Sequence, residues 1–132
     1  MKQRCKDCGS STRPANKPGP RCATCYRSVV KARRERAHAR RVEQTYGLAE
    51  GEYEKLLAFQ GGVCALCRKP FKTKRGAVDH NHKTGRVRGI VHGWENTIIG
   101  RIGDSAEWAR RLVDYLTSSP AERAGLDRRP GG

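Results

Sequence analysis

The first part of the chain changes from a segment broken by turns to an uninterrupted basic stretch. Residues 1–26 contain closely spaced glycines and prolines, which leave no room for a helix. From Arg27 to Gln44 no glycine or proline interrupts, alanines are interspersed, and few positions are apolar. This pattern predicts a solvated basic helix that ends near Tyr46-Gly47.

Apolar residues next recur with the period of a short amphipathic helix, predicted over about residues 49–60. Three of them share one face through their i, i+3, i+4 spacing, namely Tyr53, Leu56 and Leu57. Gly61-Gly62 follows and ends the helix.

Residues 63–91 show the short apolar runs and tight turns of β-structure. They predict strands at 63–67, 77–78 and 87–91, and Thr84-Gly85 is a plausible hairpin turn between the last two.

The pattern becomes helical again in the last third of the chain. A short helix is predicted from about Glu95, and residues 104–107 (Asp-Ser-Ala-Glu) are typical of a capping box that opens a helix to about Thr117. That helix has a stripe predicted to be buried, formed by Trp108, Leu112, Tyr115 and Leu116. After Pro120 the chain is predicted to be disordered.

Composition makes this a small, strongly basic protein. The 132 residues carry 28 Lys and Arg against 13 Asp and Glu, a net charge of +15, and only 36% are hydrophobic. A chain this polar cannot bury a large core, and its charge favours a polyanionic partner, first nucleic acid and second an anionic membrane surface. No apolar run approaches a membrane span and no secretory signal is present, so we expect a cytoplasmic protein with reduced cysteines.

The charge is concentrated in the predicted basic helix. By default such a run is a solvated helix face, but the overall excess of positive charge favours contact with phosphates. Contacts of this kind position a protein without reading bases. The candidate DNA-binding residues of this helix are Arg33, Arg34, Arg36, Arg40 and Arg41.

Four cysteines near the N-terminus have the spacing of a structural zinc site. Cys5-x-x-Cys8 and Cys22-x-x-Cys25 form two knuckles, and each lets two thiolates reach one ion. The gap between the knuckles is slightly shorter than usual. Disulfides or free thiols are the alternative, but a reduced compartment favours Zn²⁺ in a folding role.

A second cluster of polar residues lies between residues 64 and 96. Asp79-His80-Asn81-His82 falls at the end of a predicted strand, and Asn96 lies on the helix that follows the hairpin. A histidine can take a proton from water at neutral pH, whereas carboxylate and amide oxygens suit Mg²⁺. Two arginines, Arg86 and Arg88, could hold the phosphates on either side of a cut. This set is what a one-metal nuclease needs.

The same residues carry a resemblance to a known family. Three segments, GGVCALC at 61–67, VDHNHKTGRVRGIV at 78–91 and EN-x-x-x-G at 95–100, resemble the recombination endonuclease VII family of phages. That family lies within the HNH (ββα-metal, His-Me finger) nucleases. The resemblance implies that Asp79 and Asn96 hold a catalytic Mg²⁺ and that His80 is the general base. His82 matches the second histidine of the family's D-H-x-H motif, here residues 79–82. Its role stays open between assisting the phosphate and supporting the fold.

One departure from the family pattern affects a second zinc site. In the family, a second C-x-x-C usually precedes the Asn and completes a site with the first, but here those positions are His92 and Glu95. Their i, i+3 spacing still suits a ligand pair, so Cys64, Cys67, His92 and Glu95 form a candidate site. The alternative is that packing around Trp94 replaces the metal, since Trp94 and Trp108 are predicted to be core residues.

These observations predict an α+β protein with a small zinc-stapled ββα-metal core, an N-terminal zinc ribbon and flanking helices. The predicted segments are a zinc ribbon (1–26), a basic helix or linker (27–46), an HNH endonuclease VII-like domain (47–118) and a flexible tail (119–132).

The predicted function is that of a Mg²⁺-dependent DNA endonuclease with one or two structural Zn²⁺ ions. By resemblance, its substrate is branched DNA such as Holliday junctions in phage recombination or packaging, cut by a homodimer in the host-cell cytoplasm. Two alternatives remain: a nicking HNH endonuclease indifferent to DNA structure, and a non-catalytic zinc protein that binds nucleic acid.

Overall fold

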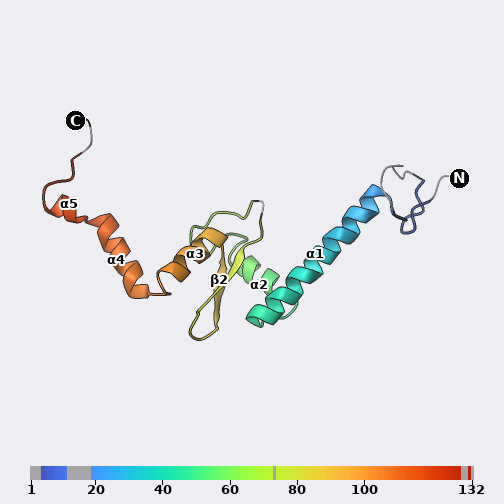
Figure 1. Cartoon of the computed structure of the whole chain (residues 1–132), viewed down its shortest axis with the longest axis horizontal. Helices are drawn as coiled ribbons and strands as arrows, with labels where there is room; N and C mark the ends of the chain where they lie inside the picture. The colour runs from blue at the N-terminus through green and yellow to red at the C-terminus, as the bar shows by residue number, and fades with distance from the viewer. Residues whose placement is uncertain (1–3, 12–18, 73, 129–130, 132) are drawn as a thin grey trace. The chain divides into compact units, whose positions relative to one another are not determined.

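The computed structural model describes residues 4–11, 19–72, 74–128 and 131 (Figure 1). The elements, in chain order, are α1 (Ala23–Tyr46), α2 (Glu52–Phe59), β1 (Ala77–His80), β2 (Val87–Val91), α3 (Gly93–Arg101), α4 (Ala106–Thr117) and α5 (Pro120–Arg123). Helices and a two-stranded sheet confirm the predicted α+β class. The chain forms two compact units, Met1–Lys55 and Leu56–Gly132. Among the described residues, no helix combines the length and apolar character needed to span a bilayer.

The first unit is dominated by α1, which confirms the predicted basic helix. It begins at Ala23, four residues earlier than predicted, because the Cys22 side chain accepts a hydrogen bond from the Cys25 amide and caps the helix. Gly47 ends it, and its N–H donates to the Glu43 carbonyl. Pro14 and Pro18 of the predicted turn-rich segment lie outside the described residues.

The helix predicted at 49–60 is present but shorter. α2 begins at Glu52, because Gly51 adopts a positive φ of 82°, which is not helical. The Glu52 carboxylate accepts a hydrogen bond from the Ala49 amide, which lies before the helix. Tyr53 is buried and meets His38 edge-on at 4.8 Å between ring centroids.

The second unit is built on an antiparallel β1–β2 hairpin. Ala77 pairs with Val91, Val78 with Ile90 and Asp79 with Gly89. The hairpin confirms two of the predicted strands and the turn at Thr84-Gly85. Its apolar side chains Val78, Ile90 and Val91 are buried, as is Cys64 from the segment before the hairpin, and they form a small core.

The strand predicted at 63–67 is wrong. This segment makes one isolated β-bridge, between Val63 and Pro70. It then forms a turn, in which the Arg68 N–H donates a hydrogen bond to the Cys64 carbonyl. A strand would point alternate side chains to opposite faces, whereas the turn allows Cys64 and Cys67 to face one place.

The C-terminal helices require three corrections. α3 begins at Gly93, two residues before the prediction. The cap of α4 is Ser105, whose hydroxyl accepts from the Trp108 amide, because the Asp104 carboxylate is engaged elsewhere. After Pro120 the chain forms α5, where Ser119 caps the helix and Pro120 opens it. Residues 129, 130 and 132 of the predicted tail lie outside the described residues.

The predicted burial of the aromatic residues is also wrong. The stripe on α4 is exposed, with Trp108 at 46% and Leu116 at 72%, and Trp94 on α3 is 61% exposed. The amphipathic pattern of α4 therefore marks a face that the described part of this chain does not cover.

Candidate active site and metal centres

The sheet register changes at the candidate active site. Asp79 pairs with Gly89 and His80 with Val87, so Arg88 is the extra residue of a β-bulge. Regular alternation would point Arg88 away from the side chain of Asp79, but the bulge turns it back. Gly89 allows the strand to lie close to its neighbours, since a Cβ there would be 3.2 Å from Gln60 Oε1 and 3.3 Å from Ala65 Cβ.

Arg88 and Asp79 form a two-pronged ion pair. Arg88 Nε donates to Asp79 Oδ2 at 2.6 Å, and its Nη2 donates to Oδ1 at 2.9 Å. The Asp79 side chain is 5% exposed and that of Arg88 is 34% exposed. Hydrogen bonds, first with Asp79 and then with Asp104, raise the pKa of Arg88 above its usual range. The planar guanidinium thus contacts both oxygens of the buried carboxylate.

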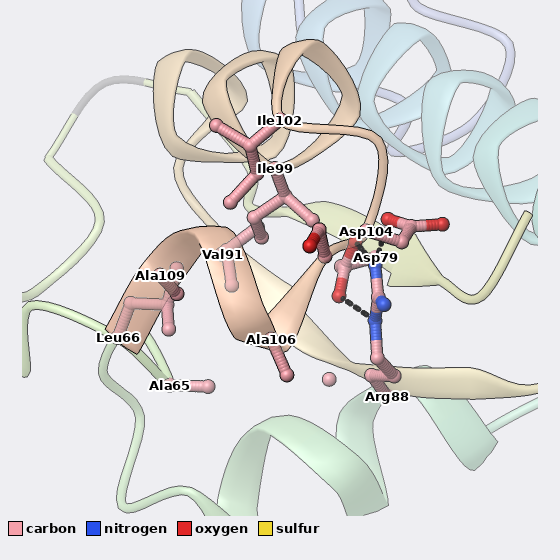
Figure 2. A pocket seen from close by; sticks show the side chains of 12 residues that line it. Ala65, Leu66, Asp79, Arg88, Val91, Ile99, Ile102, Asp104, Ala106 and Ala109 are labelled. Atoms are coloured by element: carbon pink, nitrogen blue, oxygen red, sulfur yellow. Dashed lines mark hydrogen bonds and ion pairs between the residues drawn. The ribbon is translucent and has the colours of Figure 1, made fainter. Parts of the chain in front are cut away.

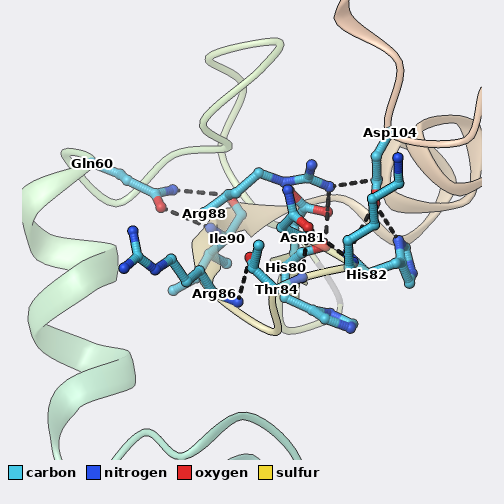
Figure 3. A network of polar contacts seen from close by, with 11 residues as sticks. Gln60, His80, Asn81, His82, Thr84, Arg86, Arg88, Ile90 and Asp104 are labelled. Atoms are coloured by element: carbon cyan, nitrogen blue, oxygen red, sulfur yellow. Dashed lines mark hydrogen bonds and ion pairs between the residues drawn. The ribbon is translucent and has the colours of Figure 1, made fainter.

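Asp104 links this pair to the histidine motif (Figure 3). It accepts from Arg88 Nη2 at 2.8 Å, from the His82 amide at 2.9 Å, and lies 2.7 Å from His82 Nδ1. The bonds from Arg88 are the largest cause that lowers the pKa of Asp104. Asp104 adopts a positive φ of 56°, which brings its side chain back toward the hairpin. The capping-box interpretation missed this residue, and no signal in the sequence marks it as a partner of Arg88.

Asn81 shapes the turn that carries the two histidines. Its side-chain oxygen accepts from the amides of Lys83 and Thr84, each at 2.9 Å, and its own amide donates to the Arg86 carbonyl. The rings of His80 and His82 then lie 4.7 Å apart between centroids. The predicted histidine pair is therefore brought together beside Asp79.

Asn96 lies on the helix that packs against β1. Gly100, one helical turn farther on and thus on the same face, comes close to His82: a Cβ at Gly100 would be 3.9 Å from His82 Cε1. Asn96 is half-buried. The face of α3 that carries Asn96 therefore turns toward the histidine motif.

An apolar pocket borders the ion network on one side (Figure 2). Leu66, Val91, Ile99 and Ile102 line it together with two alanines from α4, whereas Asp79, Arg88 and Asp104 lie at its edge. Apolar walls reduce the screening by water and strengthen the ion pairs beside them.

The four residues of the second candidate zinc site converge. Cys64 Sγ donates to Glu95 Oε2 at 2.8 Å, Cys67 Sγ lies 3.5 Å from His92 Nδ1, and His92 Nδ1 lies 3.0 Å from Glu95 Oε2. All four ligand atoms fall within 4.8 Å of one another, which fits a structural zinc ion. Burial raises the pKa of Glu95, but hydrogen bonds from Cys64, Cys67 and His92 outweigh it and lower the pKa to about 2.

The cysteines of the first unit form an equally tight cluster. Cys8 Sγ and Cys22 Sγ are 3.8 Å apart, close to the edge of about 3.8 Å that Zn–S bonds of about 2.3 Å give a tetrahedron. Hydrogen bonds from the backbone, the largest from Cys22, lower the pKa of Cys5 to about 6, whereas neighbouring thiols, first Cys22, raise that of Cys25. Within residues 4–11 and 19–26 no strand forms, and the four cysteines lie on a turn at 5–8 and at the N-terminus of α1, whereas residues 12–18 of the predicted ribbon lie outside the described residues.

The predicted DNA-binding residues are at the surface. Arg33, Arg34, Arg36, Arg40 and Arg41 are exposed on α1, and Arg86 is exposed on the hairpin. Arg88 differs from them, because its guanidinium is held by two carboxylates and by the His80 carbonyl at 3.1 Å.

Comparisons with known proteins identify one family and two phage relatives. Residues 39–118 match the family described as recombination endonuclease VII. The Gene 59 protein of Mycobacterium phage D29 is 43% identical over 123 residues, which cover 89% of this chain and 74% of that protein. The Gene 59 protein of Mycobacterium phage L5 is 42% identical, over 89% and 75% of the two chains. No solved structure matches the chain.

Proposed function

This chain belongs to the recombination endonuclease VII family, and from that premise we propose that it is a Mg²⁺-dependent DNA endonuclease with a ββα-metal core. The observation that carries the proposal is the cluster at the end of the β1–β2 hairpin. There, buried Asp79 and the paired rings of His80 and His82 lie beside the face of α3 that bears Asn96. A ligand for a hard cation, a base and an amide oxygen are thus gathered on one hairpin and one helix.

Asp79 and Asn96 are the residues that would hold Mg²⁺. A carboxylate offers about four lone-pair positions, of which Arg88 uses two, so Asp79 keeps oxygen positions for a cation. Both residues supply the oxygen ligands that Mg²⁺ prefers. When bound, the ion supplies positive charge to the phosphate and the leaving oxygen.

His80 is the general base of the proposed reaction. Its imidazole takes a proton from water while the water oxygen forms a bond to phosphorus, and the bond from phosphorus to the leaving oxygen breaks. The leaving oxygen then takes a proton from solvent, and the His80 imidazolium returns its proton to solvent. One water is thus consumed for each phosphodiester bond cut, and the base is regenerated.

His82 and Arg88 support this arrangement. The carboxylate of Asp104 lies 2.7 Å from His82 Nδ1, which fixes the orientation of that ring and turns Nε2 outward. The sequence suggested that Arg88 holds a phosphate, but two carboxylates already engage it. We assign it instead to positioning Asp79, whereas exposed Arg86 remains a candidate phosphate contact.

α1 is the proposed DNA-contacting surface of the first unit. At about 100° per residue, its five candidate arginines fall within an arc of about 160°, opposite the buried Val42. An exposed basic face of this kind binds phosphates without sequence preference.

The proposed substrate is branched DNA, such as a Holliday junction in phage recombination or packaging, cut in the cytoplasm of the host cell. Membership of a recombination endonuclease family supports this assignment, because recombination proceeds through branched DNA. A labelled four-way junction and a duplex of matched sequence distinguish it from a nicking enzyme indifferent to DNA structure. We expect faster cleavage of the junction under single-turnover conditions, and equal rates would contradict the assignment.

A homodimer fits the paired cuts that junction resolution needs. The exposed apolar stripe of α4 offers a surface for a second copy of the chain, since monomers rarely leave such patches uncovered. A sedimentation mass equal to one chain at micromolar concentration would contradict the dimer.

The His80→Ala variant separates the nuclease from a non-catalytic binding protein. We expect the variant to keep its affinity for DNA and to lose metal-dependent cleavage, because only the proton acceptor is removed. Lys83→Ala, an exposed change in the same hairpin, is the control and should cut normally. Cleavage by His80→Ala at the wild-type rate would overturn the assignment of the base.

A further inference from the structure

A second pocket lies outside the candidate active site, at the N-terminal end of α3. It has a volume of about 580 Å³, within the range of about 300 to 1,000 Å³ typical of sites for small ligands. Trp94 and Phe71 supply its aromatic surface, and Lys69, Lys72, Lys74 and Arg75 surround them. Neither the motif analysis nor the proposed cleavage reaction assigns a role to this pocket.

Trp94 is an unusual residue to leave in water. It is 61% exposed, on the first turn of α3 and next to Glu95, the buried residue of that helix. Trp94 and Asn96 are two positions apart and thus lie about 200° apart around the helix axis. The indole therefore stands on a different face of α3 from the one that turns toward His82.

The pocket is electrostatically one-sided. No carboxylate lines it, and in the described part of the chain none of its four lysine and arginine side chains takes part in an ion pair. Four unneutralised cations around an open hollow attract an anion.

The aromatic floor of the pocket is fixed in place. The Phe71 ring packs on His92, with 4.7 Å between centroids. Behind it, Gly76 approaches so closely that a Cβ there would fall 2.7 Å from the ring and 2.3 Å from Ile90. The Phe71 ring is therefore held against His92 and Gly76.

We infer that this pocket binds an unpaired DNA nucleotide, with its base stacked on Trp94 and its phosphates held by the surrounding lysines and Arg75. An exposed aromatic ring amid cations is the combination that binds single strands, because every base has a face to stack and every linkage carries a charge. A base inside a duplex already stacks on its neighbours and cannot use Trp94 in this way.

This inference rests on the proposed function and deepens it. A branch point exposes nucleotides that have lost a stacking neighbour, whereas an intact duplex exposes none away from its ends. The pocket would thus supply a preference for branched over linear DNA, on the opposite side of α3 from the cleavage site.

Tryptophan fluorescence tests the inference directly. The chain has two tryptophans, so a Trp108→Phe, His80→Ala protein reports on Trp94 alone and does not cut its ligand. A short single strand of thymidine nucleotides should quench the emission, whereas a long blunt-ended duplex without a loop, at the same nucleotide concentration, and inorganic tripolyphosphate should not. If anisotropy shows that the strand binds while the emission stays constant, the inference is overturned.

Substitution of Trp94 gives a second measurement. Removal of one base–aromatic stack should weaken single-strand binding by about 5- to 150-fold in Trp94→Ala, whereas Trp94→Phe should retain most of the affinity. Equal affinities of wild type and Trp94→Ala would overturn the inference. If the wild type cuts no DNA but Trp94 is still quenched, the proposed nuclease function is wrong and the pocket still binds a nucleotide. If the wild type cuts normally and Trp94 is not quenched, the nuclease function stands and the inference about the pocket is overturned.

Discussion

Asp104 joins Arg88 and His82 through a single buried carboxylate. Its side chain is 7% exposed and lies within 2.8 Å of a donor on each. We expect Arg88 to divide its hydrogen bonds between Asp79 and Asp104, so that loss of one acceptor concentrates the guanidinium on the other.

Asp104→Asn should therefore slow cleavage and raise the Mg²⁺ concentration needed for half-maximal rate. Without the second carboxylate, Arg88 competes more strongly with Mg²⁺ for the oxygens of Asp79. A lost charged hydrogen bond of about 1.5–3 kcal/mol corresponds to a cleavage rate about 10- to 100-fold lower. A Mg²⁺ titration of single-turnover cleavage measures both effects. Asp114→Asn, an exposed change on α4, is the control, and an unchanged titration in Asp104→Asn would contradict the account.

The same residue should make folding stability depend on pH. The pKa of Asp104 is lowered in the folded protein, so the unfolded chain binds the proton more readily, and the stability that this carboxylate contributes is present above about pH 4 and lost as the pH falls. The difference in unfolding free energy between wild type and Asp104→Asn should be largest near pH 6 and shrink toward pH 2. Comparison of urea unfolding at each pH measures it; a difference that grows in acid would be inconsistent with this sign.

Residue types and their order along the chain were sufficient to predict the members of the candidate site, but not all of their contacts. Asp79, His80 and His82 are close in sequence, so a hairpin of any register keeps them together. The contact of Arg88 with Asp79 depends on a β-bulge. The contacts of Asp104 with Arg88 and His82 depend on the positive φ of Asp104 itself. Neither follows from side-chain pattern.

At the scale of elements, the two metal clusters have different settings. The first lies on a knuckle and the start of α1, and the second joins the turn at Cys64 to the first turn of α3. Helices with strong local signals and the β1–β2 hairpin followed from the sequence. The segment at 63–67 did not, because its apolar residues suit a strand, whereas the chain turns there through the hydrogen bond from the Arg68 N–H to the Cys64 carbonyl.

Zinc content should reflect both clusters. We expect the wild type to bind two zinc ions for each chain, one at each cluster. Cys8→Ser should reduce the content to about one and leave the thermal transition of the second unit intact, whereas Cys64→Ser should lose the other ion and destabilise that unit. Atomic emission and calorimetry measure these effects. A wild type with one zinc ion that Cys64→Ser retains would show that the cluster of Cys64, Cys67, His92 and Glu95 holds no metal.

The exposed arginines of α1 should set the salt dependence of DNA binding. Each phosphate contact contributes about 0.9 to the slope of log affinity against log salt. A variant with Arg33, Arg36 and Arg40 changed to Gln should bind more weakly at low salt and with a shallower slope, whatever the DNA sequence. Loss of affinity without a change of slope would indicate a fold defect instead.

On the scale of the whole molecule, a small core is combined with a large excess of positive charge. Only eight apolar residues are buried among those described, three of them cysteines of the two candidate zinc clusters. The exposed face of α4 could not be predicted from the sequence. A hydrophobic stripe predicts that the face is buried, but it does not identify the surface that covers it. The charge and the family together favour DNA as the partner.

The most direct test of this account is cleavage of a labelled four-way junction by the wild-type protein, with Mg²⁺ and with EDTA. The account predicts cutting near the branch point in Mg²⁺ and intact DNA in EDTA, with binding in both. Tight binding without cutting under Mg²⁺, Mn²⁺ or any other divalent ion would contradict it, and the protein would then be a binding module whose +15 charge is its main functional feature.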